Sequence, residues 1–204
     1  MLKVIGLTGG IATGKSTVSE ILFKLGAEII DADKIGHQIY LPDTEAWHDI
    51  INVFGEDLLL PDRTINRPKL GEIVFNDKGA LTKLNRIVHP RMYKKFEDEI
   101  EANKKRTEDK GVVFLDAAIL IEGNWLPLVN QVWVVVADQD IVIDRLCSKK
   151  GFTEEHAKSR ISSQLSDEER IKFADVVIEN NDTISEVRAR VHEAWNRMVA
   201  NSFN

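Results

Sequence analysis

A glycine-rich segment near the start of the chain constrains the fold more than any other feature. Its letters, GGIATGKS, match the pattern G-x-x-x-x-G-K-S from Gly9 to Ser16. The segment follows a short β-branched run at residues 3–7 and opens into a stretch whose apolar residues recur at helical spacing. Glycines let such a loop turn so that successive N–H groups converge on phosphate oxygens, and the following helix N-terminus adds partial positive charge. The segment therefore predicts a loop that binds a nucleoside triphosphate.

The residues of this loop are expected to have separate tasks. Lys15 would reach the β- and γ-phosphates of ATP and act in catalysis, and the Ser16 hydroxyl would ligate the Mg²⁺ that accompanies ATP. The motif alone does not separate a kinase from a GTPase or an ATP-driven switch. The sequence has no N-K-x-D element to read guanine, which favours a small-molecule kinase. The residues predicted to bind ATP here are Gly10, Ile11, Ala12, Thr13, Gly14, Lys15, Ser16 and Thr17.

Strand and helix signals alternate after the loop. Residues 27–33 form a short apolar run ending in two acids, and residues 112–116 and 132–136 are continuous apolar runs. Strand, helix and strand follow one another at the start of the chain, so the sheet should be parallel. We predict an α/β fold, a P-loop nucleotide kinase-like parallel sheet flanked by helices. It would be one domain over residues 1–204, with a core at about 1–33, 107–140 and 171–204, a helical substrate-binding insertion at about 34–106 and a helical lid at about 141–170.

The end of the chain carries further signals. Residues 175–180 predict a last strand, and Ser166 and Glu169 have the spacing of a capping box. The closing segment repeats apolar residues at helical intervals and should form a helix with one buried face. That face would consist of Val187, Val191, Ala194, Trp195 and Met198.

Composition argues against several classes of function. Hydrophobic residues are 43% and charged residues 29% of the 204, as in globular domains. The formal net charge of −6 disfavours sequence-independent binding of nucleic acid, which needs a basic surface. The single cysteine, Cys147, can form no internal disulfide, and no apolar stretch approaches the length of a membrane span. We therefore expect a cytoplasmic protein that binds neither nucleic acid nor membrane; its oligomeric state stays open.

Three acids stand at predicted strand ends. Asp31 and Asp33 follow the second strand, and Asp116 ends the third. Ligands of open α/β sheets bind beyond the carboxyl ends of the strands, so all three acids should face the phosphate loop. A kinase needs a carboxylate at the attacking hydroxyl and an acid near Mg²⁺, and Asp116 is placed like a Walker-B acid. From the residues alone, Asp33 as the base is one of two open interpretations, and Asp31 could equally cap the next helix.

The charged segment 138–170 supplies arginines that could neutralise a transferred phosphoryl group. Arg145, Arg160 and Arg170 lie in it, and Gln164 shares a helical face with Arg160. A solvated helix face is the simpler interpretation of these arginines when they are considered by themselves. The histidines show no metal-ligand spacing, so no metal held by the protein alone is expected.

Several segments together resemble the dephospho-coenzyme A kinase family, over nearly the whole chain. The opening loop, helix and D-A-D segment is similar to the start of that family. Residues 84–92 (LNRIVHPRM) resemble its H-P element, and residues 144–181 resemble its lid, with R…R-I…Q spacing and a late A-D…I-x-N. These elements in this order are more specific than the loop. Ala12 departs from the family, which usually has glycine at that place.

The resemblance implies ATP-dependent phosphorylation of the ribose 3′-hydroxyl of dephospho-coenzyme A, with ATP and Mg²⁺ as cofactors and dephospho-coenzyme A as the small-molecule substrate. Asp33 resembles the family's base and would be catalytic. Arg145 and Arg160 resemble lid arginines, with Arg145 catalytic and bound to ATP, and Asn180 matches a position near the adenine. The residues implied to bind the substrate are Asp33, His89, Arg91, Asp116, Arg160 and Gln164.

Two other interpretations stay open at this point. One is a different P-loop small-molecule kinase, such as a nucleoside monophosphate-type enzyme with another acceptor pocket. The other is a catalytically silent nucleotide-binding partner protein, which would have no need to keep a base together with lid arginines.

Overall fold

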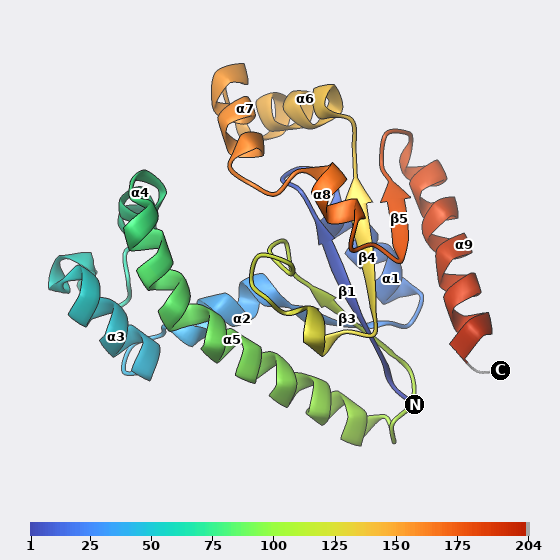
Figure 1. The fold of residues 1–204 in the computed structure, drawn as a ribbon, viewed down its shortest axis with the longest axis horizontal. Helices are drawn as coiled ribbons and strands as arrows, with labels where there is room; N and C mark the ends of the chain where they lie inside the picture. The colour runs from blue at the N-terminus through green and yellow to red at the C-terminus, as the bar shows by residue number, and fades with distance from the viewer. Residues whose placement is uncertain (203–204) are drawn as a thin grey trace. The chain divides into compact units, whose positions relative to one another are not determined.

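The computed structural model describes residues 1–202, and the chain divides into two compact units (Figure 1). The first, here called the core unit, comprises Met1–Ile30 and the chain from Ala102 onward. The second, the inserted unit, is Asp31–Glu101. The functional assignment of the insertion to substrate binding, and of residues 141–170 to a lid, stays a prediction.

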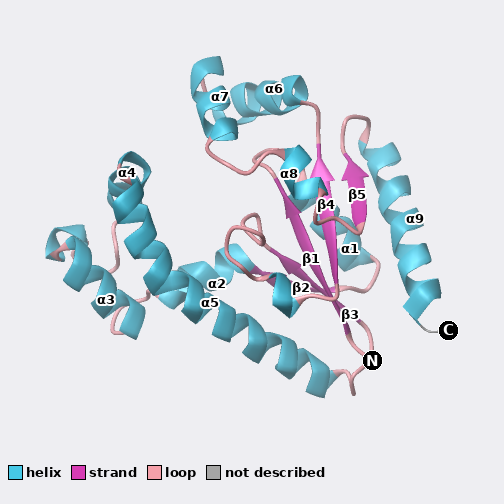
Figure 2. Ribbon diagram, viewed as in Figure 1, coloured by secondary structure: helices cyan, strands magenta, loops and turns pink. Residues whose placement is uncertain are grey.

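A five-stranded sheet forms the centre of the core unit, in the order β2-β3-β1-β4-β5 (Figure 2). β1 pairs in parallel with β3 and β4, and β4 pairs in parallel with β5, as the alternating strand and helix signals predicted. The register sets Leu7 beside Asp116 and Gly9 beside Val135. The carboxyl ends of three central strands therefore meet where the glycine-rich loop begins. The strands are β1 (Lys3–Gly9), β2 (Glu28–Asp31), β3 (Val112–Asp116), β4 (Gln131–Val136) and β5 (Val176–Glu179).

The helices of the core unit cover the sheet and continue beyond its carboxyl edge. One face of the sheet packs with α1 and α9 in a single apolar cluster that includes the fully buried Trp133. The predicted apolar face of the last helix lies in this cluster, which confirms the helical spacing read from the sequence. The helices are α1 (Lys15–Lys24), the 3₁₀ turn η2 (Leu126–Leu128), α6 (Gln139–Lys150), α7 (Glu154–Ser162), α8 (Asp167–Ile171) and α9 (Ile184–Ser202).

A second apolar cluster joins α6 and α7 to the glycine-rich loop. Val142 and Leu146 of α6 pack with Ala157 of α7, and the loop side chains Ile11 and Ala12 rest against this group. Since protein interiors are close-packed, the path of the loop depends on how these two helices pack. The expected helices in this charged segment are thus present, and the Ser166–Glu169 capping box is formed at the start of α8.

The inserted unit is helical, consisting of α2 (Ala32–Ile39), α3 (Glu45–Phe54), the 3₁₀ turn η1 (Glu56–Leu58), α4 (Arg67–Asn76) and most of α5 (Lys78–Arg106). Side-chain caps begin its helices: the Thr44 hydroxyl accepts from the Trp47 N–H, and the Asn66 carbonyl oxygen accepts from the Lys69 N–H. No helix in the described part of the chain is both long and apolar enough to cross a membrane.

The structure corrects one detail of the second strand. The strand expected over residues 27–33 ends at Asp31, whose carboxylate accepts a hydrogen bond of 3.0 Å from the Lys34 N–H and caps α2. Asp33 stands in the first turn of that helix, so the two acids do not share one side of a strand. Capping of α2 is favoured over a longer strand, because the Asp31 side chain accepts from an N–H group at the helix start that would otherwise have no partner.

Candidate active site

The glycine-rich loop is held from outside by its carbonyl groups. The Asn180 amide nitrogen donates to the Thr13 carbonyl at 2.7 Å, and Arg145 Nη1 lies 3.3 Å from the carbonyls of both Ala12 and Thr13. Arg145 Nη2 in turn donates to the Asn180 carbonyl at 2.8 Å. Because the N–H of a trans peptide points opposite to its carbonyl, a carbonyl fixed outward turns the next N–H inward. Arg145 and Asn180 thus both bind the backbone of the loop, and their predicted contacts with ATP stay predictions.

Backbone conformation explains two residues of the loop. Gly14 has a φ of 96°, and a Cβ placed on it would lie 1.8 Å from the Asn180 amide nitrogen, so only glycine fits. Ala12 has a φ of 57°, the left-handed conformation that favours glycine. The Ala12 methyl group therefore sits on a strained backbone and packs against the α6–α7 cluster. The family that the sequence resembles usually has glycine at this position.

The start of α1 points its free amides into the loop. Gly14 is the N-cap residue and supplies no side-chain hydrogen bond, so the Lys15 and Ser16 amides have no partner from the helix or its cap, while the Thr17 amide donates to the Gly14 carbonyl at 3.0 Å. These amides and the helix dipole favour an anion at this point. Ser16 is exposed and Thr17 is half-buried, and both lie in the first turn of α1. Their predicted role in binding ATP stays a prediction.

Lys15 forms an ion pair with Asp116, the acid that ends β3. Their side chains are 17% and 12% exposed, so solvent screens this pair only partly. The strand register explains the meeting, because β3 lies directly beside β1 and ends where the loop starts. The expectation that Asp116 faces the phosphate loop is confirmed by this contact.

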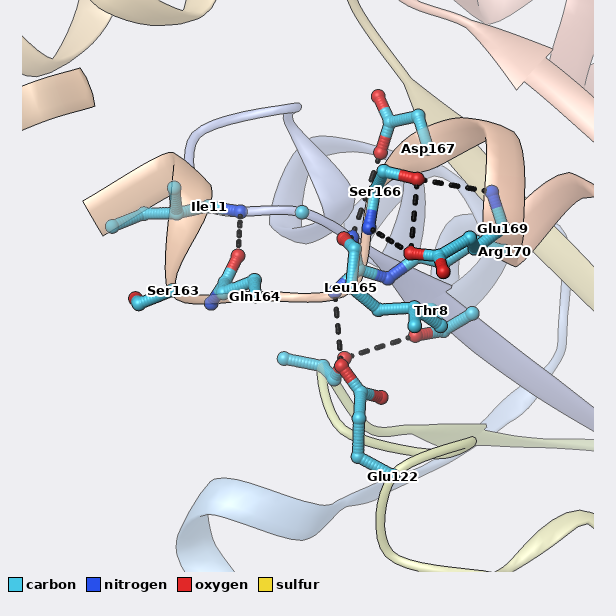
Figure 3. A network of polar contacts seen from close by, with 12 residues as sticks. Thr8, Ile11, Glu122, Ser163, Gln164, Leu165, Ser166, Asp167, Glu169 and Arg170 are labelled. Carbon is cyan, nitrogen blue, oxygen red and sulfur yellow. Dashed lines mark hydrogen bonds and ion pairs between the residues drawn. The ribbon is translucent and has the colours of Figure 1, made fainter. Parts of the chain in front are cut away.

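A cavity of about 680 Å³ lies beside the loop within the core unit. Gly10, Ile11 and Thr13 form its loop side, and the remainder comes from Ala137, from α6, α7 and α8, and from the segment that connects α7 and α8. Gln164, between α7 and α8, reaches across it: its Oε1 accepts the Ile11 N–H at 2.8 Å (Figure 3). The structure therefore brings Gln164 to the phosphate loop, while its predicted contact with substrate stays a prediction.

The structure assigns the three arginines of segment 138–170 to different surroundings. Arg145 binds the loop, and Arg160 lies half-buried on α7, with Nε 3.4 Å from Nε2 of His156. Arg160 is outside the residues that line the cavity, and its predicted lid role stays a prediction. Arg170 is 1% exposed and lines the cavity, which contradicts a solvated helix face. Its burial was missed because its partners are distant in sequence; the capping box before it was the one local signal that α8 is ordered.

Asp167 also lines this cavity. Burial raises the pKa of its carboxyl group, and the neighbouring Arg170 guanidinium counteracts part of that rise. The carboxylate lies 3.6 Å from Arg170 Nη1, so the pair carries opposite charges at close range.

The inserted unit contains three further predicted residues. Asp33 is exposed in the first turn of α2. His89 is half-buried in α5, and burial lowers the pKa of its imidazole. Arg91 Nη2 donates to Asp49 at 2.6 Å, and Nη1 donates to the Ile87 carbonyl. This unit has its own cavity of about 390 Å³, lined by His37, Tyr40, Leu41, Pro42, Leu60, Thr64, Ile65, Arg67 and Pro68.

Among residues 1–202, no three His, Cys, Asp or Glu side chains gather as a metal site. The oxygen donors at the loop are the exposed Ser16 hydroxyl and the Asp116 carboxylate. Two such donors suit Mg²⁺, which is usually held by one or two protein oxygens together with substrate phosphates and water.

A glycine-rich loop between the first strand and first helix of a parallel sheet, with a lysine and an acid at its mouth, defines the P-loop class of nucleotide-binding proteins. Solved structures agree: a shikimate kinase from Acinetobacter baumannii aligns with a TM-score of 0.55 at 17% identity, over 100% of this chain and 97% of that one. At that identity the likeness concerns the fold alone. The chain belongs to the dephospho-CoA kinase family, whose model matches residues 3–186.

Individual relatives support this membership. A dephospho-CoA kinase of Carboxydothermus hydrogenoformans is 42% identical over 94% of this chain and 92% of its own length. One of Listeria monocytogenes is 39% identical over 98% of this chain and 100% of its own. The solved dephospho-CoA kinase of Campylobacter jejuni aligns with a TM-score of 0.74 at 29% identity, covering 100% of both chains.

Proposed function

We propose that this chain transfers the γ-phosphoryl group of ATP to the ribose 3′-hydroxyl of dephospho-CoA, giving CoA and ADP in the last step of CoA biosynthesis. The observation that carries this proposal is the loop in which Arg145 and Asn180 bind the carbonyls of Ala12 and Thr13 from outside. A loop held in this way is ready for phosphate without reorganisation, which is what electrostatic catalysis requires. Membership of the dephospho-CoA kinase family supports the choice of acceptor.

The resting pair of Lys15 and Asp116 defines the first step of nucleotide binding. Incoming β- and γ-phosphates compete with the carboxylate for the ammonium group, because both are anions at close range. Lys15 then stabilises the charge that spreads over the transferred group, and the amides of the first turn of α1 hold the remaining phosphate oxygens.

Mg²⁺ bound with ATP would be held by the Ser16 hydroxyl, with Asp116 close by once Lys15 has turned to the phosphates. The exposure of Ser16 and the position of Asp116 at the end of β3 support this assignment. When bound, the ion would supply positive charge that neutralises part of the charge on the phosphates. Residues 10–17 and Asn180 together would keep the nucleotide in one orientation.

The acceptor side of the reaction involves the inserted unit. Asp33, exposed at the start of α2, would accept the proton of the 3′-hydroxyl as it attacks, and His89 and Arg91 would bind the acceptor. Arg160 and Gln164 would complete substrate binding from the lid. The Asp49 contact supports this role for Arg91, because it holds the guanidinium in one orientation. The need for ATP supports a cytoplasmic location.

A coupled assay that measures ADP release tests the proposal. ADP should form with dephospho-CoA and only at background level with nucleosides or nucleoside monophosphates, and mass spectrometry should find one phosphoryl group added to dephospho-CoA. Preferred phosphorylation of another acceptor would identify a different small-molecule kinase. Tight ATP binding without transfer to any acceptor would indicate a silent nucleotide-binding protein.

A further inference from the structure

Arg170, on α8, is the only arginine among the buried residues of the described part of the chain. Its Nη1 donates to the Leu165 carbonyl, and its Nη2 lies 3.2 Å from Oε1 of Glu122, in the segment after β3 (Figure 3). Asp167 provides a second carboxylate, 3.6 Å from Nη1. The guanidinium therefore joins the segment after β3 to the segment that connects α7 and α8.

The same guanidinium lies against the phosphate loop. A Cβ placed on Gly10 would lie 3.4 Å from Arg170 Nη1 and 3.4 Å from the Asp167 carboxylate, so these two groups border the space beside Gly10 and would touch any larger residue there. Gln164, next to the Leu165 carbonyl that Arg170 fixes, accepts the Ile11 N–H at 2.8 Å. Arg170 is thus connected to the Gly10–Ile11 segment through Leu165 and Gln164, and its guanidinium lines the same cavity as that segment.

Stability alone is a weak explanation for this arrangement. A buried ion pair often contributes no more to folding than apolar side chains of the same volume, because both charges lose their hydration. One polar atom, Nε of Arg170, is buried without a hydrogen-bond partner, which adds to that cost. An arginine kept here at such a cost fits a task in positioning, since its planar fork can hold several acceptors at fixed angles.

The two halves of the loop are held by different groups. Arg145 and Asn180 fix the carbonyls of Ala12 and Thr13, just before the amides and the lysine that bind the phosphates. The Gly10–Ile11 segment is held by Gln164, whose neighbour Leu165 is in turn held by Arg170. We propose that Arg170 is a positioning residue for phosphoryl transfer, which holds the Gly10–Ile11 segment in place while Arg145 and Asn180 support nucleotide binding. This inference rests on the proposed function.

We expect substitution of Arg170 to lower turnover while nucleotide affinity is retained. Arg170→Met should lower kcat by roughly 10–100-fold, because a displacement of about 1 Å near the reacting groups can cost about 10²-fold. The dissociation constant for ADP should change by less than about 3-fold, because Lys15 and the start of α1 are untouched. Arg170→Lys should recover part of the lost turnover, since an ammonium can replace some but not all of the fork's contacts. Arg197→Met, at an exposed arginine of α9 paired with Glu193, is the matched control and should leave both quantities unchanged.

A second measurement follows the loop itself without any acceptor. The Ile11 amide should exchange with solvent faster in Arg170→Met than in the wild type, as followed by NMR in the ADP complex, because its bond to Gln164 loosens. This readout does not depend on the acceptor. A wild-type chain that fails to phosphorylate dephospho-CoA would refute the proposed function, while the exchange of Ile11 would still decide whether Arg170 positions the loop.

Three outcomes would overturn the inference. The first is an equal loss of turnover and ADP affinity in Arg170→Met, and the second is unchanged turnover together with unchanged Ile11 exchange. The third is that both Arg170 variants, and also Glu122→Gln, fail to fold, because Arg170 would then be needed for stability. A lower kcat with retained ADP affinity and faster Ile11 exchange would support it.

Discussion

Asn180 offers the sharpest test of how the phosphate loop is held. Replacing it by alanine removes the hydrogen bond of 2.7 Å from its side-chain amide to the Thr13 carbonyl. The backbone carbonyl of residue 180 remains and can still accept from Arg145. Asn180 is 7% exposed, so no bulk solvent replaces the lost donor directly. The Thr13 carbonyl keeps only the longer contact with Arg145, at 3.3 Å. We expect a loss of about 1–2 kcal/mol in the free energy of unfolding, which combines one hydrogen bond with a small cavity.

For a chain of this size that loss corresponds to a decrease of about 2–8 °C in Tm, measured by calorimetry. A less ordered loop must also be ordered when ADP binds. If this costs about 1.4 kcal/mol of binding free energy, the dissociation constant for ADP rises about 10-fold, which isothermal titration calorimetry can measure. Asn181→Ala is the matched control. The Asn181 side chain bonds to Asp138, and within residues 1–202 it forms no hydrogen bond with the loop, so this variant should keep the wild-type affinity for ADP.

Gly14 extends the same reasoning to a pair of changes. Gly14→Ala by itself should abolish ADP binding, because its Cβ would overlap the Asn180 amide at 1.8 Å. Combined with Asn180→Ala the overlap disappears, so the double variant should be more stable than the sum of the single changes predicts. Two results would refute the reasoning: wild-type ADP affinity in Asn180→Ala, or an equal loss of affinity in Asn181→Ala.

Three further predictions concern other parts of the site. Lys15→Ala should weaken ADP binding and lower turnover together, and an unchanged affinity and rate would contradict the phosphate role of Lys15. Asp33→Asn should lower kcat by about 10²–10⁴-fold while ATP still binds, and near-normal turnover would remove Asp33 from the role of base. Burial lowers the pKa of His89 in the folded chain, so the unfolded chain binds more protons and stability should decrease as the pH falls below about 6.5. Unfolding in urea at pH 5 and pH 7.5 should show a smaller pH-dependent loss in His89→Gln than in the wild type.

The phosphate loop, the parallel sheet and the apolar face of α9 could be predicted because each depends on a local pattern. Glycine spacing defines the loop, and a repeat of apolar residues at helical spacing defines the face that packs in the core. Asp31 could not be assigned, because one acid can end a strand or cap the helix that follows, and only the backbone conformation decides.

Contacts between residues far apart in sequence leave no local signal. Gln164 bonds to Ile11 across 153 positions, and Arg170 meets Glu122 across 48. An arginine in a charged segment looks solvated in the sequence, because nothing nearby shows that a loop and a second carboxylate will cover it. The hydrogen bonds from Arg145 and Asn180 to loop carbonyls leave no local signal for the same reason, and the predicted contacts of both residues with ATP stay predictions.

The order of the strands has a consequence for how the protein forms during synthesis. The glycine-rich loop is made before the strands beside it in the sheet: β1 pairs with β3 and β4, so the register of Lys3 with Val112 requires the whole inserted unit to be made first. Asn180, which fixes the Thr13 carbonyl, comes later still. At 5–20 residues per second the loop waits on the order of ten seconds for its last support. Until β3 and β4 have been made, the first strand has both edges unpaired and is exposed to aggregation.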